Sequence, residues 1–188
     1  LAVDCLTTDQ VKQLFGPDAS AKKWSDLDPS FPDAEIAGFI PGTDSGTYDY
    51  MASDVVDAES GTLREDFEVS EDDNILVQGV AGTNNSVGFF GYTYFEENAD
   101  KVKALAIDDG NGCVEPSAET AQAGEYTPLA RPLFIYVSNE AYTGNEATKA
   151  YVDFYIDNLG DIAETAQFIP LNETDYAATQ DALAGIAG

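Results

Sequence analysis

Histidine is absent from this 188-residue chain, and basic residues are scarce. Eight lysines and arginines stand against 35 aspartates and glutamates, so the formal net charge is -27 at pH 7. Without histidine, the chain cannot use an imidazole as a general base, as a metal ligand or in a Ser-His-Asp triad. With so few cations, it also lacks the electrostatic surface that binds DNA, RNA or an anionic membrane. The composition therefore excludes nucleic acid as a partner.

Long hydrophobic runs are also missing. No stretch approaches the roughly 20 apolar residues of a membrane helix, and no basic, apolar signal segment opens the chain. The apolar fraction of 44% still supports a hydrophobic core, and the length excludes two or more large domains. Because the chain begins at Leu1 without an initiator methionine, we expect a processed or truncated product. The acidity has two interpretations, adaptation to high salt or charge that keeps an exported protein in solution.

The chain has only two cysteines, Cys5 and Cys113. Neither has a neighbouring cysteine, so there is no C-x-x-C redox motif and no zinc-site spacing. Two interpretations stay open: a structural disulfide, as in exported proteins, or two buried free thiols. We favour the disulfide, which would close a long loop and contribute about 4 to 5 kcal/mol in the chain-entropy model.

Strand-like and helix-like segments alternate along the chain. Apolar runs predict strands at 36–40, 87–92, 102–107 and 133–137, of which the last is the clearest buried strand. Capping residues and helical spacing predict helices at 7–15, from Thr47 onward, and at 71–80, 95–98, 145–158 and 172–183. We expect Gly160 to close the helix that ends near Asn158. The alternation indicates an α/β fold with a largely parallel sheet flanked by helices.

The loop Gly42-Thr43-Asp44-Ser45-Gly46-Thr47 carries the clearest chemical signal. It lies between a predicted strand and a predicted helix, where backbone N–H groups and the helix dipole favour anions. Gly46 lets the backbone approach a ligand, and the hydroxyls of Ser45 and Thr47 can donate hydrogen bonds. The alternative is an ordinary helix cap in which Ser45 satisfies the first turn. A Walker A loop is excluded because no lysine follows the glycine.

Arginine occurs only at positions 64 and 131. On so acidic a chain, the default for either residue is a weak ion pair on the surface. Arg64, however, lies between the two helices predicted to begin near Ser45 and Ser70. If both helix N-termini face one cleft, Arg64 could present a bidentate fork to an oxyanion there. Arg131, beside Pro132 at the entrance of a predicted strand, is interpreted as structural.

The many carboxylates give no specific sign of catalysis or metal binding. The acidic clusters at 72–74 and 108–111 lack the spacing of an EF-hand calcium loop. A glycosidase pair would be indistinguishable among so many acidic residues. We therefore expect no enzyme activity, no metal and no cofactor, and a phosphatase is the least favoured alternative.

The segment Pro41–Tyr50 (PGTDSGTYDY) and further motifs at 70–80, 87–92, 116–120 and 131–137 occur in the same order in one known family. They resemble the phosphate-binding proteins of bacterial ABC transporters, which have a type II periplasmic-binding-protein fold. The resemblance implies that residues 1–137 are the second of two α/β lobes. It implies that residues 138–188 are a C-terminal helical segment that returns toward the first lobe.

The resemblance also implies a function, which is binding inorganic phosphate for an ABC transporter permease without catalysis. Ser45, Gly46 and Thr47 match the family's phosphate loop, and Arg64 takes the place of an arginine that many relatives carry where this chain has Pro41. The location would be periplasmic or extracellular, with membrane anchoring through an absent N-terminus as an option. The first lobe has its own phosphate loop and an acidic acceptor, and neither is found here, so a missing first-lobe segment would be needed. The alternatives are another oxyanion or a ligand-free surface or signalling module.

Overall fold

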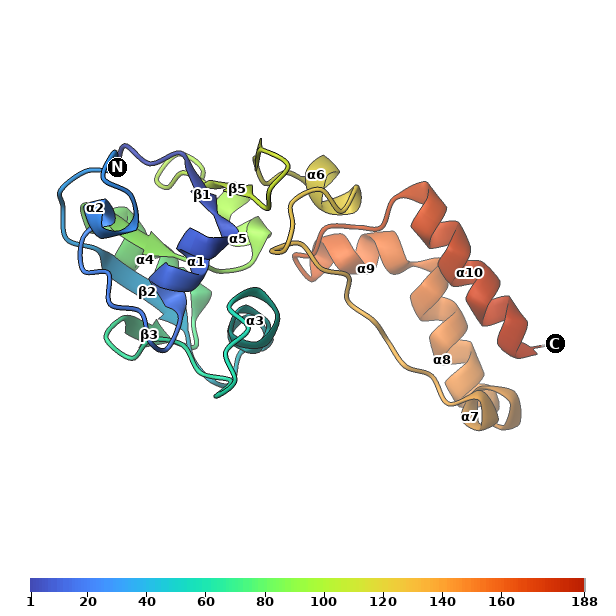
Figure 1. Cartoon of the computed structure of the whole chain (residues 1–188). Helices are drawn as coiled ribbons and strands as arrows, with labels where there is room; N and C mark the ends of the chain where they lie inside the picture. The colour runs from blue at the N-terminus through green and yellow to red at the C-terminus, as the bar shows by residue number, and fades with distance from the viewer. Residues whose placement is uncertain (188) are drawn as a thin grey trace. The chain divides into compact units, whose positions relative to one another are not determined.

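The computed structural model describes residues 1–187 and contains two compact units. The N-terminal unit comprises Leu1–Ala130, and the C-terminal unit begins at Arg131 (Figure 1). The sequence predicted a boundary after residue 137, whereas the structure groups residues 131–137 with the C-terminal unit. The assignment of these parts to the two lobes of a binding protein stays a prediction.

Two three-stranded sheets form the frame of the N-terminal unit. In one sheet β5 is central, parallel to β1 and antiparallel to β6. In the other, β2 is central and parallel to both β3 and β4. The strands are β1 Cys5–Thr7, β2 Ala37–Pro41, β3 Glu68–Ser70, β4 Ser86–Gly88, β5 Ala106–Asp108 and β6 Cys113–Val114. The predicted α/β class with mostly parallel pairing is confirmed, although the strands divide between two sheets.

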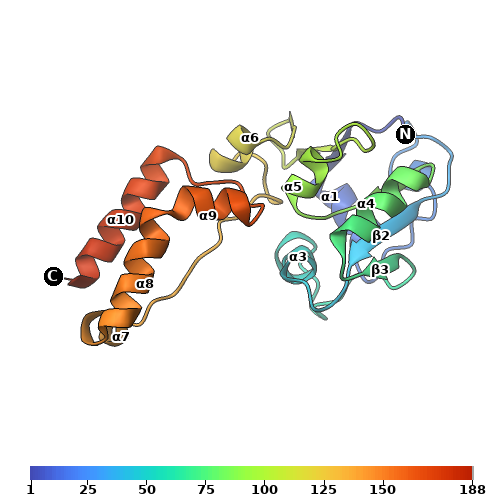
Figure 2. The same ribbon diagram turned by 180° about the vertical axis from the view of Figure 1, so that it is seen from behind.

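Short helices follow most of these strands. They are α1 Thr8–Phe15, α2 Trp24–Leu27, α3 Gly46–Tyr50 with a π-helical turn Met51–Val55, α4 Asp73–Gly82, α5 Tyr92–Glu96 and α6 Ala118–Gln122. The helix predicted at 7–15 is confirmed, and a capping box starts it. Thr7 Oγ1 accepts the Gln10 N–H at 3.2 Å, and Gln10 Oε1 accepts the Thr7 N–H at 2.9 Å. From behind, α4 lies along the β2 sheet (Figure 2).

Most buried apolar residues of the N-terminal unit gather in one core. It includes Leu6, Val11, Leu14, Phe15, Trp24, Ile40, Met51, Val55 and Phe67. Trp24 is completely buried, and its indole N–H donates to the Asn85 carbonyl at 2.9 Å. This single core spans α1, β2 and the segment before β3, and it fixes the sheet that carries the candidate site.

Cys5 and Cys113 form the predicted disulfide, with a Cα–Cα distance of 6.1 Å. Cys5 lies in β1 and Cys113 in β6, the two strands that flank β5. The bond links positions 108 residues apart in the sequence. It therefore ties the start of the chain to the far edge of the first sheet, and the alternative of two free thiols is wrong.

The strand predicted at 133–137 is not formed. Residues 131–138 have neither helical nor strand structure, and they run as a coil between α6 and α7 (Figure 1). The prediction of a buried strand is wrong here, because among the described residues no strand pairs with this apolar run and most of its side chains are exposed. Arg131 is exposed rather than placed at the entrance of a buried strand. Local sequence cannot supply the pairing partner that a strand needs.

Helices make up the rest of the C-terminal unit. They are α7 Asn139–Gly144, α8 Glu146–Asp157, α9 Leu159–Thr165 and α10 Glu173–Ala187. The helices predicted at 145–158 and 172–183 are confirmed. Gly160 does not close the first of them, because Asn158 ends α8 and α9 starts directly afterwards with Gly160 inside it. The buried apolar residues described for this unit are Tyr142, Val152 and Ile156.

Candidate anion-binding site

The carboxyl ends of three parallel strands meet at one edge of the β2 sheet. Pro41 at the end of β2 is in register with Ser70 of β3, and Phe39 of β2 is in register with Gly88 of β4. The loops that leave β2, β3 and β4 therefore start at the same edge. In open α/β sheets, ligands bind at this edge. The loop that follows the central strand β2 leads directly into α3, so it occupies the middle of the edge.

Ser45, Gly46 and Thr47 lie together at the start of α3. Ser45 is the N-cap residue, and its Oγ accepts the Thr47 N–H at 3.2 Å. Gly46 is exposed, and Ser45 and Thr47 are half-buried. The helix-cap interpretation of Ser45 is therefore confirmed. It is compatible with anion binding, because a hydroxyl that accepts one hydrogen bond can still donate its own proton to a ligand.

The loop is fixed to the neighbouring strand by backbone hydrogen bonds. The Gly42 N–H donates to the Ser70 carbonyl at 3.2 Å, which extends the β2–β3 pairing by one residue. The Ser45 N–H then donates to the Gly42 carbonyl at 3.1 Å and closes a tight turn. These bonds hold the first turn of α3 in place before any ligand arrives, which lowers the ordering cost of binding.

Glu71 is a residue of this edge that the sequence analysis did not identify. Its carboxylate accepts the Asp44 N–H at 3.4 Å, directly beside the loop. A Cβ at position 42 would overlap this carboxylate, so a larger residue there would displace the Glu71 side chain from the loop. The signal that could have revealed Glu71 is its place just after Ser70, at the end of β3. That strand has only three residues and was not predicted.

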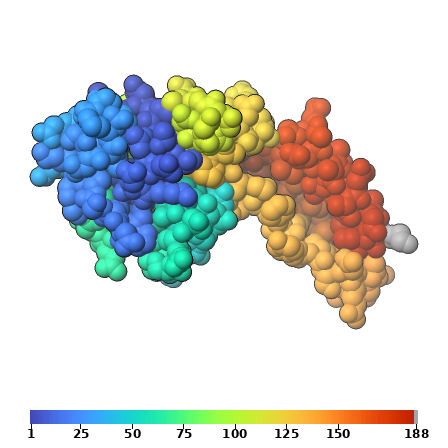
Figure 3. Space-filling model, viewed as in Figure 1, coloured from blue at the N-terminus to red at the C-terminus, as the bar shows by residue number. Residues whose placement is uncertain are grey.

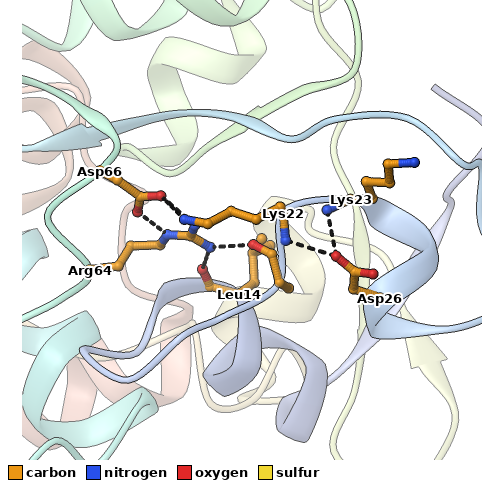
Figure 4. A network of polar contacts seen from close by, with 7 residues as sticks. Leu14, Lys22, Lys23, Asp26, Arg64 and Asp66 are labelled. Carbon is orange, nitrogen blue, oxygen red and sulfur yellow. Dashed lines mark hydrogen bonds and ion pairs between the residues drawn. The ribbon is translucent and has the colours of Figure 1, made fainter.

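Arg64 has a different environment from the loop (Figure 4). Its Nε and Nη2 donate to the two carboxylate oxygens of Asp66 at 2.6 and 2.9 Å. Its Nη1 donates to the carbonyls of Leu14 at 2.9 Å and Ala21 at 3.2 Å. The guanidinium carbon lies 4.1 Å from the centre of the Phe67 ring. Only 4% of Arg64 is exposed, so this cation forms a buried hub that joins α1 to the segment before β3.

The register of β3 places Arg64 relative to the loop. β3 runs from Glu68 to Ser70, and Ser70 is the residue at the loop edge. Arg64 precedes the strand, so it lies toward the opposite, amino-terminal end. The structure thus brings Ser45, Gly46 and Thr47 together, and the described hydrogen bonds of Arg64 run elsewhere. Four of its five N–H donors are used in this hub.

Asp66 is the charged partner in this hub. The hydrogen bonds from Arg64 and then from Lys22, whose Nζ lies 2.5 Å from Asp66 Oδ2, lower the pKa of the Asp66 carboxyl far below its ordinary value. The Asp66 side chain is 48% exposed, so water weakens these interactions. The arrangement keeps Asp66 ionised and the Arg64 charge compensated.

The described residues contain no group of three or more acidic or cysteine side chains placed to hold a metal ion. The acidic cluster at 108–111 is used by its own loop, because Asp108 Oδ1 accepts the N–H groups of Gly110 at 2.8 Å and Gly112 at 2.9 Å. Within residues 1–187, none of the helices is both long and apolar enough to cross a membrane.

The fold and the loop at its sheet edge define the class of this protein. The chain belongs to the PBP superfamily, whose domain model matches residues 2–158. This finding confirms the family resemblance and the fold class predicted from the sequence.

Named relatives narrow the class further. Protein SphX of Synechococcus elongatus is 44% identical over 182 residues, which cover 95% of this chain and 53% of the relative. The phosphate-binding protein PstS of Staphylococcus saprophyticus is 35% identical over 187 residues, covering 99% of this chain and 56% of the relative. The crystal structure of a possible phosphate binding protein from Planctomyces limnophilus matches with a TM-score of 0.89 and 35% identity, over 100% of this chain and 66% of that one. The chain therefore spans about half the length of the curated relatives it matches.

Proposed function

We propose that this chain is one lobe of an extracytoplasmic solute-binding protein that takes up inorganic phosphate for an ABC transporter permease. The observation that carries the proposal is the Ser45–Thr47 loop at the start of α3, at the carboxyl end of the central strand β2. The similarity to a named phosphate-binding protein supports phosphate as the ligand. We infer that binding occurs without catalysis, since the hydrogen bond described for the Ser45 hydroxyl comes from the Thr47 N–H and not from a general base.

In this proposal, backbone N–H groups at the start of α3 and the hydroxyls of Ser45 and Thr47 donate hydrogen bonds to phosphate oxygens. The net charge of -27 repels anions at long range. At physiological salt the Debye length is about 8 Å, so charges farther away than this repel the anion only weakly. The affinity for the anion then depends mainly on the hydrogen-bond donors next to it. Arg64 as a phosphate ligand stays a prediction, and it would need the guanidinium to exchange part of its pairing with Asp66.

Glu71 favours phosphate over another oxyanion. A carboxylate beside the loop can accept a hydrogen bond from a protonated oxyanion, whereas it repels one that carries no proton. Phosphate retains at least one proton at neutral pH and sulfate retains none. The position of Glu71 against the Asp44 N–H therefore supports a phosphate site and disfavours sulfate.

The disulfide supports an extracytoplasmic location, because disulfides persist in oxidising compartments. We propose that a first lobe, encoded upstream of Leu1, supplies the other half of the phosphate site. We also propose that the protein delivers phosphate to a permease and that the upstream segment attaches it to a membrane.

Calorimetric titration tests the phosphate site. The protein extended upstream of Leu1 and the 188-residue chain would each be titrated with phosphate, sulfate and arsenate. We expect phosphate and arsenate to bind the extended protein and sulfate to bind much more weakly. Thr47→Val should weaken phosphate binding about five- to tenfold, as for one neutral hydrogen bond. Thr83→Val, at an exposed threonine after α4, is the matched control and should bind normally. Absence of phosphate binding in the extended protein would refute the proposal.

A further inference from the structure

A hollow of about 530 Å³ opens in the N-terminal unit, between α4 and the turn that follows α5. The two helices contact each other and are seen together in Figure 2. In the opposite view, the blue atoms of the N-terminal segment form the surface of this unit (Figure 3). The volume lies in the range of sites for small organic molecules. The residues that line the hollow include Asn74, Val77, Gln78, Gly82, Asn98 and Lys101.

The charge of this hollow differs from the charge of the chain. Of the 188 residues, 35 are acidic, yet the described lining contains the cation Lys101 and no carboxylate. In the part of the chain that the structure describes, four lysines form ion pairs with carboxylates, and Lys101 is not among them. Its Nζ donates to the neutral Asn98 Oδ1 at 2.8 Å. Because an ammonium has three N–H donors, Lys101 can also donate to a ligand in the hollow.

Three side-chain amides line the same hollow. Asn98 is held in place, because its Nδ2 donates to a carbonyl of α5 at 2.9 Å while its Oδ1 accepts Lys101. Asn74 donates through Nδ2 to Asp72 Oδ1 at 3.1 Å, which leaves its own Oδ1 to accept. The side-chain amide of Gln78 takes part in none of the hydrogen bonds described for residues 1–187. Amides offer both donors and acceptors, so these groups suit a ligand with several hydroxyl groups.

The remaining lining is apolar or open. Val77 and Ala81 supply methyl groups, which can contact the C–H groups of a ligand. Gly82 is the last residue of α4, and a Cβ built there meets no neighbouring group within 4 Å. The helix therefore ends at an open space, and a larger residue at position 82 would occupy part of the hollow.

We propose that this hollow is a second ligand site, which binds a monocarboxylic acid with several hydroxyl groups, such as a sugar acid. The carboxylate accepts a charge-assisted hydrogen bond from Lys101, and the hydroxyl groups exchange hydrogen bonds with Gln78 and Asn74. The single cation favours a ligand with one negative charge, because the net charge of -27 repels a dianion more strongly. No residue of the loop at 42–47 is among those that line the hollow, so the site does not depend on phosphate binding.

An NMR titration of the protein extended upstream of Leu1 tests the site, with and without saturating phosphate. The probes are gluconate and sorbitol, which share a carbon chain and differ in that sorbitol has a hydroxymethyl group in place of the carboxylate. We expect gluconate to shift the side-chain amide resonances of Asn74, Gln78 and Asn98, and to bind about tenfold more tightly than sorbitol. Absence of these shifts at millimolar gluconate would overturn the proposal, whatever the result of the phosphate titration.

A matched pair of lysine substitutions tests the charge. Lys101→Gln should weaken gluconate binding about tenfold, as for the loss of one charge-assisted hydrogen bond, and should leave sorbitol binding nearly unchanged. Lys12→Gln is the control, because Lys12 lies in α1 and is likewise outside the ion pairs described for residues 1–187. Equal weakening by both substitutions would assign the effect to the net charge of the protein and would overturn the site.

A matched pair of glycine substitutions tests the space. Gly82→Leu should weaken gluconate binding about tenfold or more, because the new side chain takes up room in the hollow. Gly144→Leu is the control and should bind gluconate normally, since Gly144 also ends a helix, α7, with open space around it. Thermal melting of both variants checks that they are folded. Normal binding by Gly82→Leu would contradict the proposal. Weaker gluconate binding with phosphate than without it would place gluconate at the loop 42–47, and would contradict the proposal too.

Discussion

The N-terminal and C-terminal units come from one acidic chain but cover their apolar residues very differently. The N-terminal unit has a large buried core, two sheets and a disulfide. The C-terminal unit has a small core between helices and a run of exposed apolar residues. The difference shows that the N-terminal unit buries most of its apolar segments within itself, whereas the C-terminal unit leaves the apolar run at 133–136 exposed. A substitution in one unit should therefore change the stability of that unit alone, and a substitution in the C-terminal unit should leave the candidate anion contacts of the N-terminal unit intact.

Removal of the disulfide should have the largest effect, and only on the N-terminal unit. Replacing Cys5 and Cys113 by alanine should lower the free energy of unfolding of that unit by about 4 to 5 kcal/mol, since the bond closes a long loop. Urea unfolding followed by hydrogen exchange of each unit measures this. A reductant should have the same effect on the parent and none on the double variant. An equal loss of protection in α8 and α10 would show that the units are not separate.

Loss of the hydrogen bonds of Arg64 should have the second-largest effect on the stability of the N-terminal unit. Arg64→Ala removes a buried cation and leaves the Leu14 and Ala21 carbonyls without their donor, so the N-terminal unit should lose about 3 kcal/mol of unfolding free energy. Arg64→Lys should lose less unfolding free energy than Arg64→Ala, because lysine keeps the positive charge. It should still lose some, because lysine cannot form the bidentate pair with Asp66. Arg131→Ala, at the exposed arginine of the other unit, is the control. Normal stability of Arg64→Ala together with loss of phosphate binding would show that Arg64 is a ligand rather than a structural hub.

A smaller effect should appear in the pH dependence of the N-terminal unit. The pKa of Asp66 is lowered in the folded protein, mainly by Arg64 and then by Lys22. A lowered folded pKa stabilises the fold above the unfolded pKa, near the ordinary value of 3.8, and the stabilisation is lost as the pH falls below it. Asp66→Asn should therefore unfold more easily than the parent at pH 7, and the difference should shrink at pH 3. A difference that stays constant with pH would assign the effect to packing.

The elements predicted correctly were those whose signals are local. The capping box of Thr7 and Gln10 fixes the start of α1, and the apolar run before Pro41 identifies β2. The loop that follows β2 could be recognised for the same reason. Capping and periodicity depend on neighbours in the sequence, which are always present.

The features that local sequence did not reveal involve distant partners. Arg64 bonds carbonyls 50 and 43 residues away in the chain, which no local pattern reveals. Glu71 belongs to the site only because β3 pairs with β2. The segment at 133–137 has the composition of a buried strand and no strand beside it among the described residues. In each case tertiary context, rather than propensity, decides the structure.

Backbone NMR during a phosphate titration tests the central claim most directly. In the protein extended upstream of Leu1, the amide resonances of Gly46 and Thr47 should shift with saturating phosphate, because their N–H groups lie at the start of α3. The amide of Gly124, remote from this loop in the sequence, is the reference and should stay in place. The account is contradicted if phosphate binds while the Gly46 and Thr47 resonances do not move.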